Sequence, residues 1–289
     1  MAGYTPGQVL GRTVGLGTLQ LGRVDTAGVA WTVASDGLRG WSGPAIRTAY
    51  TDREADHGAW AGPTYLGARV ITVAGTITAP GLAALDAAVE QLLAAASITD
   101  TTLVVGETIP KQCTVRRSGE VLVDYVTGQV ARYSVLLTAA DPRRYATALQ
   151  SQSAALPSVT GGLTLPITMP VTITATTVSG SITLTNSGSA PTRPTLTIAG
   201  PVVTPTIVAA LPGGATTQIV YGDTLLTGDV LVIDSTARTV VLNGTASRRL
   251  YFSGTWPEIP AGSSVTYSWS SPVYNSSALL TGTCRSAWM

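Results

Sequence analysis

Residues 69–96 read RVITVAGTITAPGLAALDAAVEQLLAAA, and this stretch contains two periodicities in succession. Its first ten residues are rich in β-branched side chains, which favour strands. Gly75 within them indicates a kink or a bulge. Beyond Thr78 the composition changes to helix-forming residues, so the stretch predicts a strand over residues 69–78 followed by a helix.

The predicted helix spans about residues 80–96. Pro80 suits its first turn, because the amide hydrogen that proline lacks has no partner within a helix at that position. Asp86 and Glu90 fall on one side and apolar side chains on the other, as in a helix packed on a core. The expected core-facing residues are Leu82, Leu85, Val89, Leu92 and Leu93.

Further strand signals lie on both sides of the predicted strand and helix. Short apolar stretches separated by Gly and Ser predict further strands at residues 18–22, 29–33, 102–105, 112–116, 121–126 and 129–138. The series ends at Asp141-Pro142, where the proline keeps the preceding residue out of the helical region. We therefore predict a β-rich, barrel-like domain with one α-helix over residues 1–148.

The second half of the chain contains only strand and turn signals. Residues 149–162 are uncharged and rich in Ala, Ser, Gln and Gly, which predicts a linker. Beyond it, Asn243-Gly244 is a strong hairpin turn signal. Strands are expected at residues 163–174, 181–185, 195–198, 230–234, 239–243 and 265–269. Short strands at regular spacing predict a β-sandwich or jelly roll over residues 163–289.

Charge is scarce and unevenly placed. The chain has 289 residues, of which 11% are charged, with 17 Lys and Arg against 16 Asp and Glu. This balance argues against an electrostatic nucleic-acid binder. From Tyr145 to Gly222 the single charged residue is Arg193. Residues 163–174 nevertheless alternate with Thr and contain two prolines, so we expect no membrane insertion. Residues 1–6 show no basic or apolar stretch, so we expect no secretory signal.

His57 is the only histidine and lies among Asp52, Glu54 and Asp56. These groups offer a metal or an acid–base site, but a second histidine is absent and the spacing is typical of an exposed loop. No Gly-x-Ser-x-Gly motif accompanies the histidine. We predict a solvated loop and no catalytic residues.

Other candidate sites have simpler interpretations. Asp223, Asp229 and Asp234 sit at turns, where aspartate commonly hydrogen-bonds its own backbone, and their spacing is too wide for a calcium loop. Gly213-Gly214 lacks the Lys-Ser/Thr of a phosphate loop. We predict no metal, no cofactor and no cofactor-binding residues.

Tryptophan and arginine offer interaction surfaces. Six tryptophans could stack on sugars if exposed, although core packing is the favoured interpretation. They are Trp31, Trp41, Trp60, Trp256, Trp269 and Trp288. Sixteen of the 17 basic residues are arginine, and Arg143-Arg144 and Arg248-Arg249 are candidate interface anchors. Cys113 and Cys284 are expected to be reduced and structural, with a bridge between them as the alternative.

An ordered set of motifs spans nearly the whole chain. The segments are residues 38–47 (LRGWSGPAIR), 57–65 (HGAWAGPTY), 69–77, 140–145 (ADPRRY), 184–200, 228–234 (GDVLVID), 239–244 (TVVLNG) and 256–264 (WPEIPAGSS). Together they resemble the distal tail proteins, often called minor tail proteins, of long-tailed, non-contractile bacteriophages, especially phages of actinobacteria.

The resemblance implies a virion protein at the distal end of a phage tail, assembled in the host cytoplasm. It implies that the N-terminal domain forms a hexameric ring and that a galectin-like C-terminal β-sandwich projects outward. The implied partners are other copies of the chain, the tail tube protein, the tail-tip hub or baseplate and the tape-measure protein. The family contributes no catalytic residues.

Two alternatives remain open. A carbohydrate-binding adhesin would contact host cell-wall glycans through exposed rings of the sandwich, with Trp256 and Trp269 as candidates. An enzyme such as a wall hydrolase would depend on His57. For the ring, the scarcity of charge predicts that the N-terminal faces, and not the tip of the sandwich, expose most of the apolar area.

Overall fold

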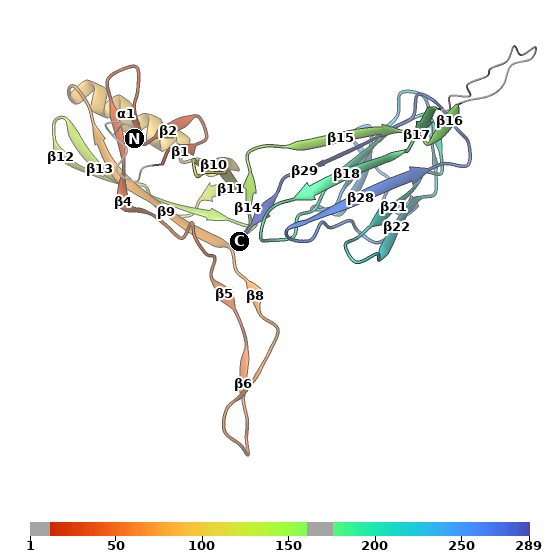
Figure 1. The fold of residues 1–289 in the computed structure, drawn as a ribbon. Coiled ribbons are helices and arrows are strands. Elements are labelled where there is room, and N and C mark those ends of the chain that lie inside the picture. Colours follow the sequence, from red (N-terminus) through yellow and green to blue (C-terminus); the bar gives the residue numbers. More distant parts are fainter. Residues whose placement is uncertain (1–11, 161–175) are drawn as a thin grey trace, which may run out of the picture. The chain divides into compact units, whose positions relative to one another are not determined.

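The computed structural model of the protein describes residues 12–160 and 176–289 (Figure 1). It divides the chain into two compact units, Met1–Thr147 with Met289 and Ala148–Trp288. The division falls beside residue 148, where the N-terminal domain was predicted to end. The predicted strand at residues 163–174 and the N-terminal residues 1–6 lie outside the described residues.

The first unit is a curled antiparallel sheet. Its strand order is β2-β1-β10-β11-β13-β9-β4-β3, and β12 and β14 also pair with β13 and β11. Gly22, between β2 and β3, donates to the carbonyl of Trp31 at 2.9 Å, so the two ends of this series meet. This agrees with the predicted barrel-like form. The bounds are β1 (Val14–Leu16), β2 (Leu19–Leu21), β3 (Arg23–Val24), β4 (Ala30–Arg39), β9 (Arg69–Thr78), β10 (Thr101–Val105), β11 (Lys111–Arg117), β12 (Leu122–Thr127), β13 (Val130–Ala139) and β14 (Arg144–Ala146).

Strand β9 occupies the predicted residues, but the role of Gly75 differs from the prediction. β9 pairs with β13 without a register shift, and the irregularity lies in β4, between Val33 and Leu38. A Cβ on Gly75 would lie 1.8 Å from the carbonyl oxygen of Thr32. The glycine therefore permits the close approach of β4 and does not kink its own strand.

The helix α1 (Leu82–Ala95) closes the core of this unit, with Leu85, Val89 and Leu92 buried. Two expectations were wrong. Pro80 precedes the helix, because Gly81 is extended and acts as the N-cap. Leu82 and Leu93 are exposed, and Leu93 lies about 100° round the helix from buried Leu92.

A two-stranded extension leaves the sheet between β4 and β9. It contains β5 (Ile46–Arg47), β6 (Tyr50–Asp52), β7 (Ala59–Ala61) and β8 (Tyr65–Leu66). β5 pairs with β8 and β6 with β7, and the described residues show no pairing of these strands with any other. We call residues 45–67 the arm; Figure 1 shows it projecting away from the curled sheet.

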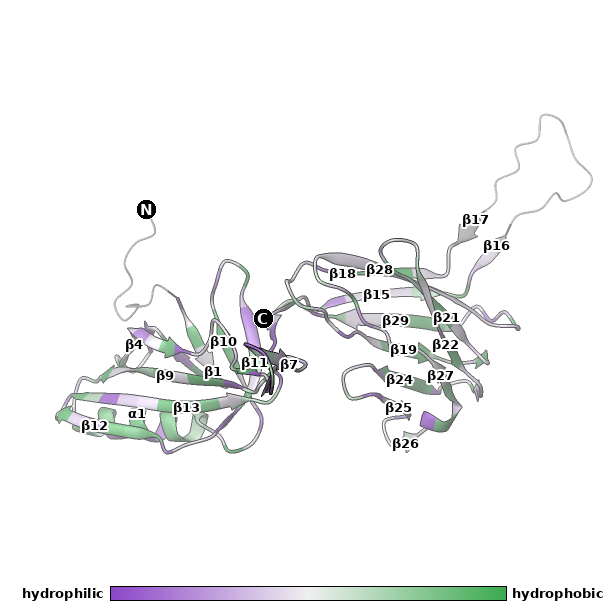
Figure 2. Ribbon diagram, turned by 90° about the horizontal axis from the view of Figure 1, so that it is seen from below, coloured by the Kyte–Doolittle hydropathy of each residue, from purple (hydrophilic) through white to green (hydrophobic). Residues whose placement is uncertain are grey.

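The second unit is a β-sandwich, as predicted (Figure 2). One sheet has the order β15-β29-β19-β24-β25-β26 and the other β18-β28-β21-β22-β27. A single apolar core includes buried side chains of both sheets, among them Leu196, Ile233 and Trp269. The bounds are β15 (Gln150–Ala155), β18 (Ser181–Asn186), β19 (Thr195–Ala199), β21 (Thr206–Ala210), β22 (Thr216–Tyr221), β24 (Val230–Asp234), β25 (Thr239–Leu242), β26 (Ala246–Ser247), β27 (Phe252–Gly254), β28 (Ser263–Ser270) and β29 (Leu279–Cys284).

Short elements complete this unit: β16 (Ser158–Thr160) with β17 (Thr176–Val178), β20 (Val202–Val203) with β23 (Thr224–Leu225), the 3-10 turn η1 (Arg249–Tyr251) and β30 (Ala287–Trp288). The linker prediction for residues 149–162 was wrong over β15, which pairs with β29 from Gln150–Cys284 to Ala155–Leu279. A polar, uncharged strand forms there because it covers a sheet edge, and its Gln150 and Gln152 side chains accept from the backbone of β18.

Candidate assembly site

The arm is held together by few contacts of its own. Backbone amides of Gly67, Gly62 and Arg53 donate across it to Ala45, Ala49 and Gly58 at 2.7, 2.8 and 3.1 Å. An isolated two-stranded ribbon is marginal in water, because neither face is covered by a core. The stability of the arm therefore depends on the contacts at its base and on any surface that covers its faces.

The arm exposes large apolar side chains along its length. Ile46, Tyr50, Trp60 and Tyr65 are each at least 61% exposed. They come from β5, β6, β7 and β8, so the exposure continues from the base toward the tip. Apolar surface concentrated on a projecting element is typical of a surface that binds another protein.

Arg69 holds the base of the arm. Its side chain is fully buried and donates from Nε to Pro142 at 2.8 Å and from Nη1 to the carbonyls of Trp41 and Gly40 at 2.5 and 3.2 Å. Burial, followed by the charge of nearby Arg144, lowers the pKa of Arg69. Because Trp41 precedes the arm and Arg69 follows it, this one side chain joins its two ends.

Glu107 links the arm base to the turn between β10 and β11. Its carboxylate accepts from the indole nitrogen of buried Trp41 at 2.6 Å and from Lys111. Arg12 and Arg144 lie 3.6 and 3.7 Å from Oε1. Burial opposes ionisation of Glu107, but the bonds from Lys111 and Trp41 outweigh it and its pKa is lowered.

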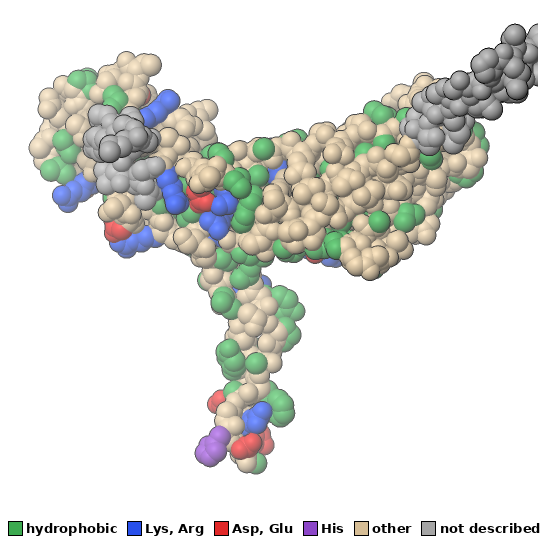
Figure 3. All heavy atoms as spheres, in the orientation of Figure 1, with side chains coloured by type: hydrophobic (Ala, Val, Ile, Leu, Met, Phe, Trp, Pro, Cys, Tyr) green, Lys and Arg blue, Asp and Glu red, His purple; other side chains and the backbone are tan. Residues whose placement is uncertain are grey.

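The predicted solvated loop around His57 is the tip of the arm. His57 is exposed, and its backbone amide donates to Asp56 at 2.8 Å. Arg53 pairs with Asp56 at 3.2 Å and lies 4.5 Å above the ring of Trp60. Charged side chains gather at this end of the arm, with the histidine at its extremity (Figure 3).

The aspartates of the sandwich are turn residues, as predicted. Asp223 and Asp234 accept from backbone amides one to three residues ahead, and Asp229 accepts from Leu226 and from the Asn243 amide. Gly213-Gly214 forms the hairpin turn between β21 and β22, with φ of 86° at both residues. Within the described part of the chain, no three His, Cys, Asp or Glu side chains gather as a metal site would require.

The tryptophans separate into buried and exposed positions. Trp31, Trp41 and Trp269 are at most 2% exposed, whereas Trp60 is exposed on the arm, contrary to the favoured packing interpretation. The indole nitrogen of Trp269 donates to Ala155 inside the sandwich. Trp256 stacks on Phe252 at 4.3 Å, and Arg249 lies 5.1 Å from its ring. Trp269 is therefore closed to a sugar, and Trp256 is partly buried against Phe252.

The paired arginines are occupied within their own domains. Arg144 contacts Glu107, and Arg143 lies 3.9 Å from Asp141. Arg248 and Arg249 lie over the rings of Tyr251 and Phe252. The cysteines are free and buried, and burial raises the pKa of Cys113 to about 12 and of Cys284 to about 11.

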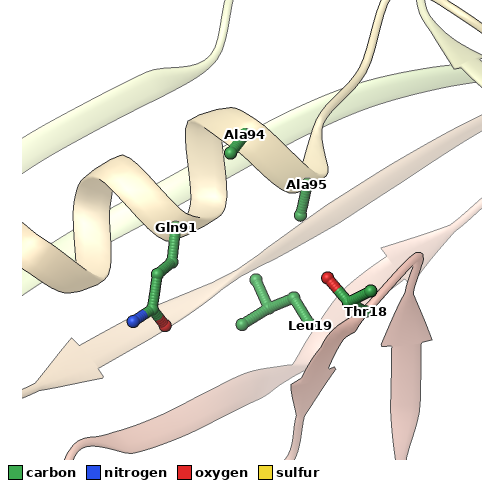
Figure 4. A pocket seen from close by; sticks show the side chains of 5 residues that line it. All are labelled: Thr18, Leu19, Gln91, Ala94 and Ala95. Carbon is green, nitrogen blue, oxygen red and sulfur yellow. The ribbon is translucent and has the colours of Figure 1, made fainter.

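A shallow pocket of about 250 Å³ lies between α1 and the turn that joins β1 to β2 (Figure 4). Its lining consists of Thr18, Leu19, Gln91, Ala94 and Ala95. One hydroxyl, one amide and apolar groups provide no nucleophile–base pair and no charge. Among the described residues, moreover, no helix is long and apolar enough to cross a membrane.

Comparison with protein families gives one match. The model for the C-terminal domain of siphovirus-type tail components matches residues 187–276. These residues are similar to that family of phage tail domains. The resemblance to phage distal tail proteins is therefore confirmed, whereas an actinobacteriophage source stays a prediction. No curated protein sequence matches this chain.

Solved structures extend the similarity, at the level of the fold, to nearly the whole chain. The crystal structure of the Dit protein of phage SPP1, described as a paradigm of the hub adsorption apparatus of phages infecting Gram-positive bacteria, aligns with a TM-score of 0.62. Identity is 14%, over 96% of this chain and 99% of that chain, which shows a shared fold. The phage P2 baseplate in its activated conformation with Ca also aligns, at 12% identity over 94% of this chain and 97% of that chain. Its TM-score is 0.49.

Sequence reasoning did not single out the exposed arm, or Arg69 and Glu107 at its base. A signal was present in the repeated pattern Trp41-Ser-Gly-Pro44 and Trp60-Ala-Gly-Pro63, which brackets the polar tip on both sides. Arg69 and Glu107 had no such signal, because Arg69 donates to backbone carbonyls and Glu107 accepts from the distant indole of Trp41.

Proposed function

We propose that this protein is a structural component of a bacteriophage tail tip, forming a ring that joins the tail tube to the tail-tip hub or baseplate. The tail-domain match and the whole-chain similarity of fold to the SPP1 Dit protein support this function. The number of copies, six, follows from the family resemblance alone. The tail tube, hub and tape-measure proteins are the proposed neighbours in the virion, with assembly in the host cytoplasm.

The observation that carries the ring is the arm. It places Ile46, Tyr50, Trp60 and Tyr65 in solvent on a ribbon that lacks a core of its own. In a ring each copy fits one patch against a different patch on the next copy. An arm reaching from one copy to the next supplies such a contact and covers its own apolar side chains.

Among the described residues, exposed large apolar side chains are more numerous in the N-terminal unit once the arm is counted. Its exposed large hydrophobics, apart from the arm and Met289, are Val24, Val70, Leu82, Leu93, Ile98, Ile109, Leu122, Tyr125 and Val126. Those of the sandwich unit are Leu149, Val208, Leu226, Val230, Leu250, Tyr251, Val273, Tyr274 and Leu279. With the arm included, the N-terminal unit holds the majority, which favours it as the ring-forming part.

The test is native mass spectrometry of the full chain beside a variant in which residues 45–67 are replaced by Gly-Gly. We expect a closed oligomer, six copies by family analogy, for the full chain and a monomer for the deletion. Thermal unfolding of the deletion serves as the control, because the curled sheet and α1 remain in it. A full chain that stays monomeric at high concentration contradicts the ring, and an unchanged oligomer without the arm contradicts the role of the arm.

A further inference from the structure

The turn between β10 and β11 contains a second pocket, of about 440 Å³. Its lining is charged, unlike that of the groove beside α1, and consists of Arg12, Gly106, Glu107, Thr108, Ile109 and Lys111. Thr108 and Ile109 are exposed at this turn, and Arg12 is about half exposed. A ligand can therefore reach the pocket from solvent.

Positive charge exceeds negative charge around this pocket. The single carboxylate of Glu107 is shared by Arg12, Lys111 and Arg144. Arg144 also donates to the main-chain oxygen of Met289. Guanidinium groups bind carboxylates through paired, charge-assisted hydrogen bonds, so a carboxylate is the chemical class this pocket fits.

The tip of the arm has the opposite charge. Asp52, Glu54 and Asp56 are exposed there beside one guanidinium, that of Arg53. Arg53 is turned toward Asp56 and the ring of Trp60. Asp52 and Glu54 thus carry the excess negative charge of a tip that is itself at the end of a projecting ribbon (Figure 3).

We propose that the pocket at Arg12 and Lys111 receives the acidic arm tip of a second copy of this chain, with Glu54 or Asp52 on the Arg12 guanidinium. The inference rests on the proposed self-assembly and adds to it the receiving site. From residue 45 to residue 56 the arm reaches at most about 35 Å, at about 3.3 Å per residue, which allows it to extend onto a neighbour. Tip and pocket are different patches, as a ring requires.

Docking at this pocket also places the tip beside the base of the receiving copy's own arm. Glu107 in the pocket accepts from the indole of Trp41, and the carbonyl of Trp41 accepts from Arg69. In the receiving copy, the docked carboxylate would contact Arg12, which lies 3.6 Å from Glu107. Glu107 in turn accepts from Trp41 at the base of that copy's own arm.

The direct test is a cross-link in the full chain carrying Glu54→Cys and Thr108→Cys, treated with a short bismaleimide. We expect covalent dimers and higher multiples on a denaturing gel. The matched control is Asp86→Cys with Thr108→Cys, because Asp86 is exposed on α1; it should give none. Cys113 and Cys284 are buried and should not contribute. An oligomer of unchanged size that yields no multiples overturns the docking site and leaves the proposed ring standing.

Charge reversal gives a second, independent readout. Arg12→Glu and Glu54→Arg should each raise the apparent dissociation constant of the oligomer about tenfold, and their combination should return it toward the original value. Arg23→Glu, at an exposed position of β3, is the control and should have little effect. Thermal unfolding verifies that each variant is folded. If the dissociation constant of the double variant rises by the product of the two single increases, the pairing is contradicted. In that case, loss of assembly on deletion of the arm would still support the ring.

Discussion

The arm and the C-terminal sandwich are both made of antiparallel strands, yet they place their apolar side chains in opposite environments. The sandwich buries them between two sheets, as with Leu196, Ile233 and Trp269. The arm leaves Tyr50 and Trp60 in solvent. Strand pairing alone therefore does not make a stable element, because the arm lacks the core that covers the apolar side chains of the sandwich.

The difference extends to polar groups. In the sandwich, Asn186 is fully buried and its side chain bonds to Gly188, Ala190, Ile259, Pro260 and Ala287. At the arm tip the charged groups are exposed and only partly paired. The sandwich is complete within one chain, whereas the arm carries unsatisfied charge and exposed rings. The following variants test that contrast.

The largest effect is expected at the arm base. Arg69→Met leaves the carbonyls of Trp41, Gly40 and Pro142 without their donor, which should cost the N-terminal unit about 3–5 kcal/mol. In calorimetry its transition should fall by on the order of 10 °C while that of the sandwich stays in place. Arg132→Met, at an exposed position of β13, is the control. An unmoved N-terminal transition would show that Arg69 does not hold the arm.

The sandwich should respond next, at Asn186. Asn186→Ala removes a side chain that joins the turn after β18 to residues 259–260 and 287. Stranding these buried groups should cost about 2–3 kcal/mol of sandwich stability, measured by urea unfolding. Asn275→Ala, which removes an exposed cap of Ser277, should cost less than about 1 kcal/mol. An equal loss of stability in the two variants would contradict the role assigned to Asn186.

This residue also shows what could be predicted from the sequence. The Asn-x-Gly, Gly-Asp and Leu-Asn-Gly motifs of the sandwich specify turns through residues that are neighbours in the sequence. The sandwich could therefore be predicted correctly. β15 was missed because a polar edge strand has no apolar signal and is defined by its distant partner β29. Arg69 and Glu107 were missed for the same reason: their roles come from residues brought near by folding.

A smaller effect, dependent on pH, is expected at Glu107. Its pKa in the folded protein lies below the ordinary value of 4.5, so its contribution is fully present above that pH and is lost as pH falls through the folded value. Glu107→Gln should therefore lower the stability of the N-terminal unit by about 2 kcal/mol at pH 7. The difference in unfolding free energy between the variant and the parent protein should become smaller toward pH 3. A gap of constant size would mean that the carboxylate charge is not what stabilises this site.

The smallest change is expected in thiol chemistry. Burial raises the pKa of Cys113 to about 12 and of Cys284 to about 11, so neither is a thiolate at pH 8. Both should resist iodoacetamide in the native protein and react after unfolding in urea, as read by mass spectrometry. Rapid labelling of Cys113 in the native state would mean that the core beside Arg69 is open.

The contrast between arm and sandwich is tested most directly by hydroxyl-radical footprinting of the oligomer and of protein diluted to the monomer. The account predicts that Tyr50, Trp60 and Tyr65 become protected on assembly, because another copy covers the arm. Tyr274 of the sandwich, 55% exposed in one chain, should be modified equally in both states. Arm residues that are oxidised equally in oligomer and monomer would contradict the account.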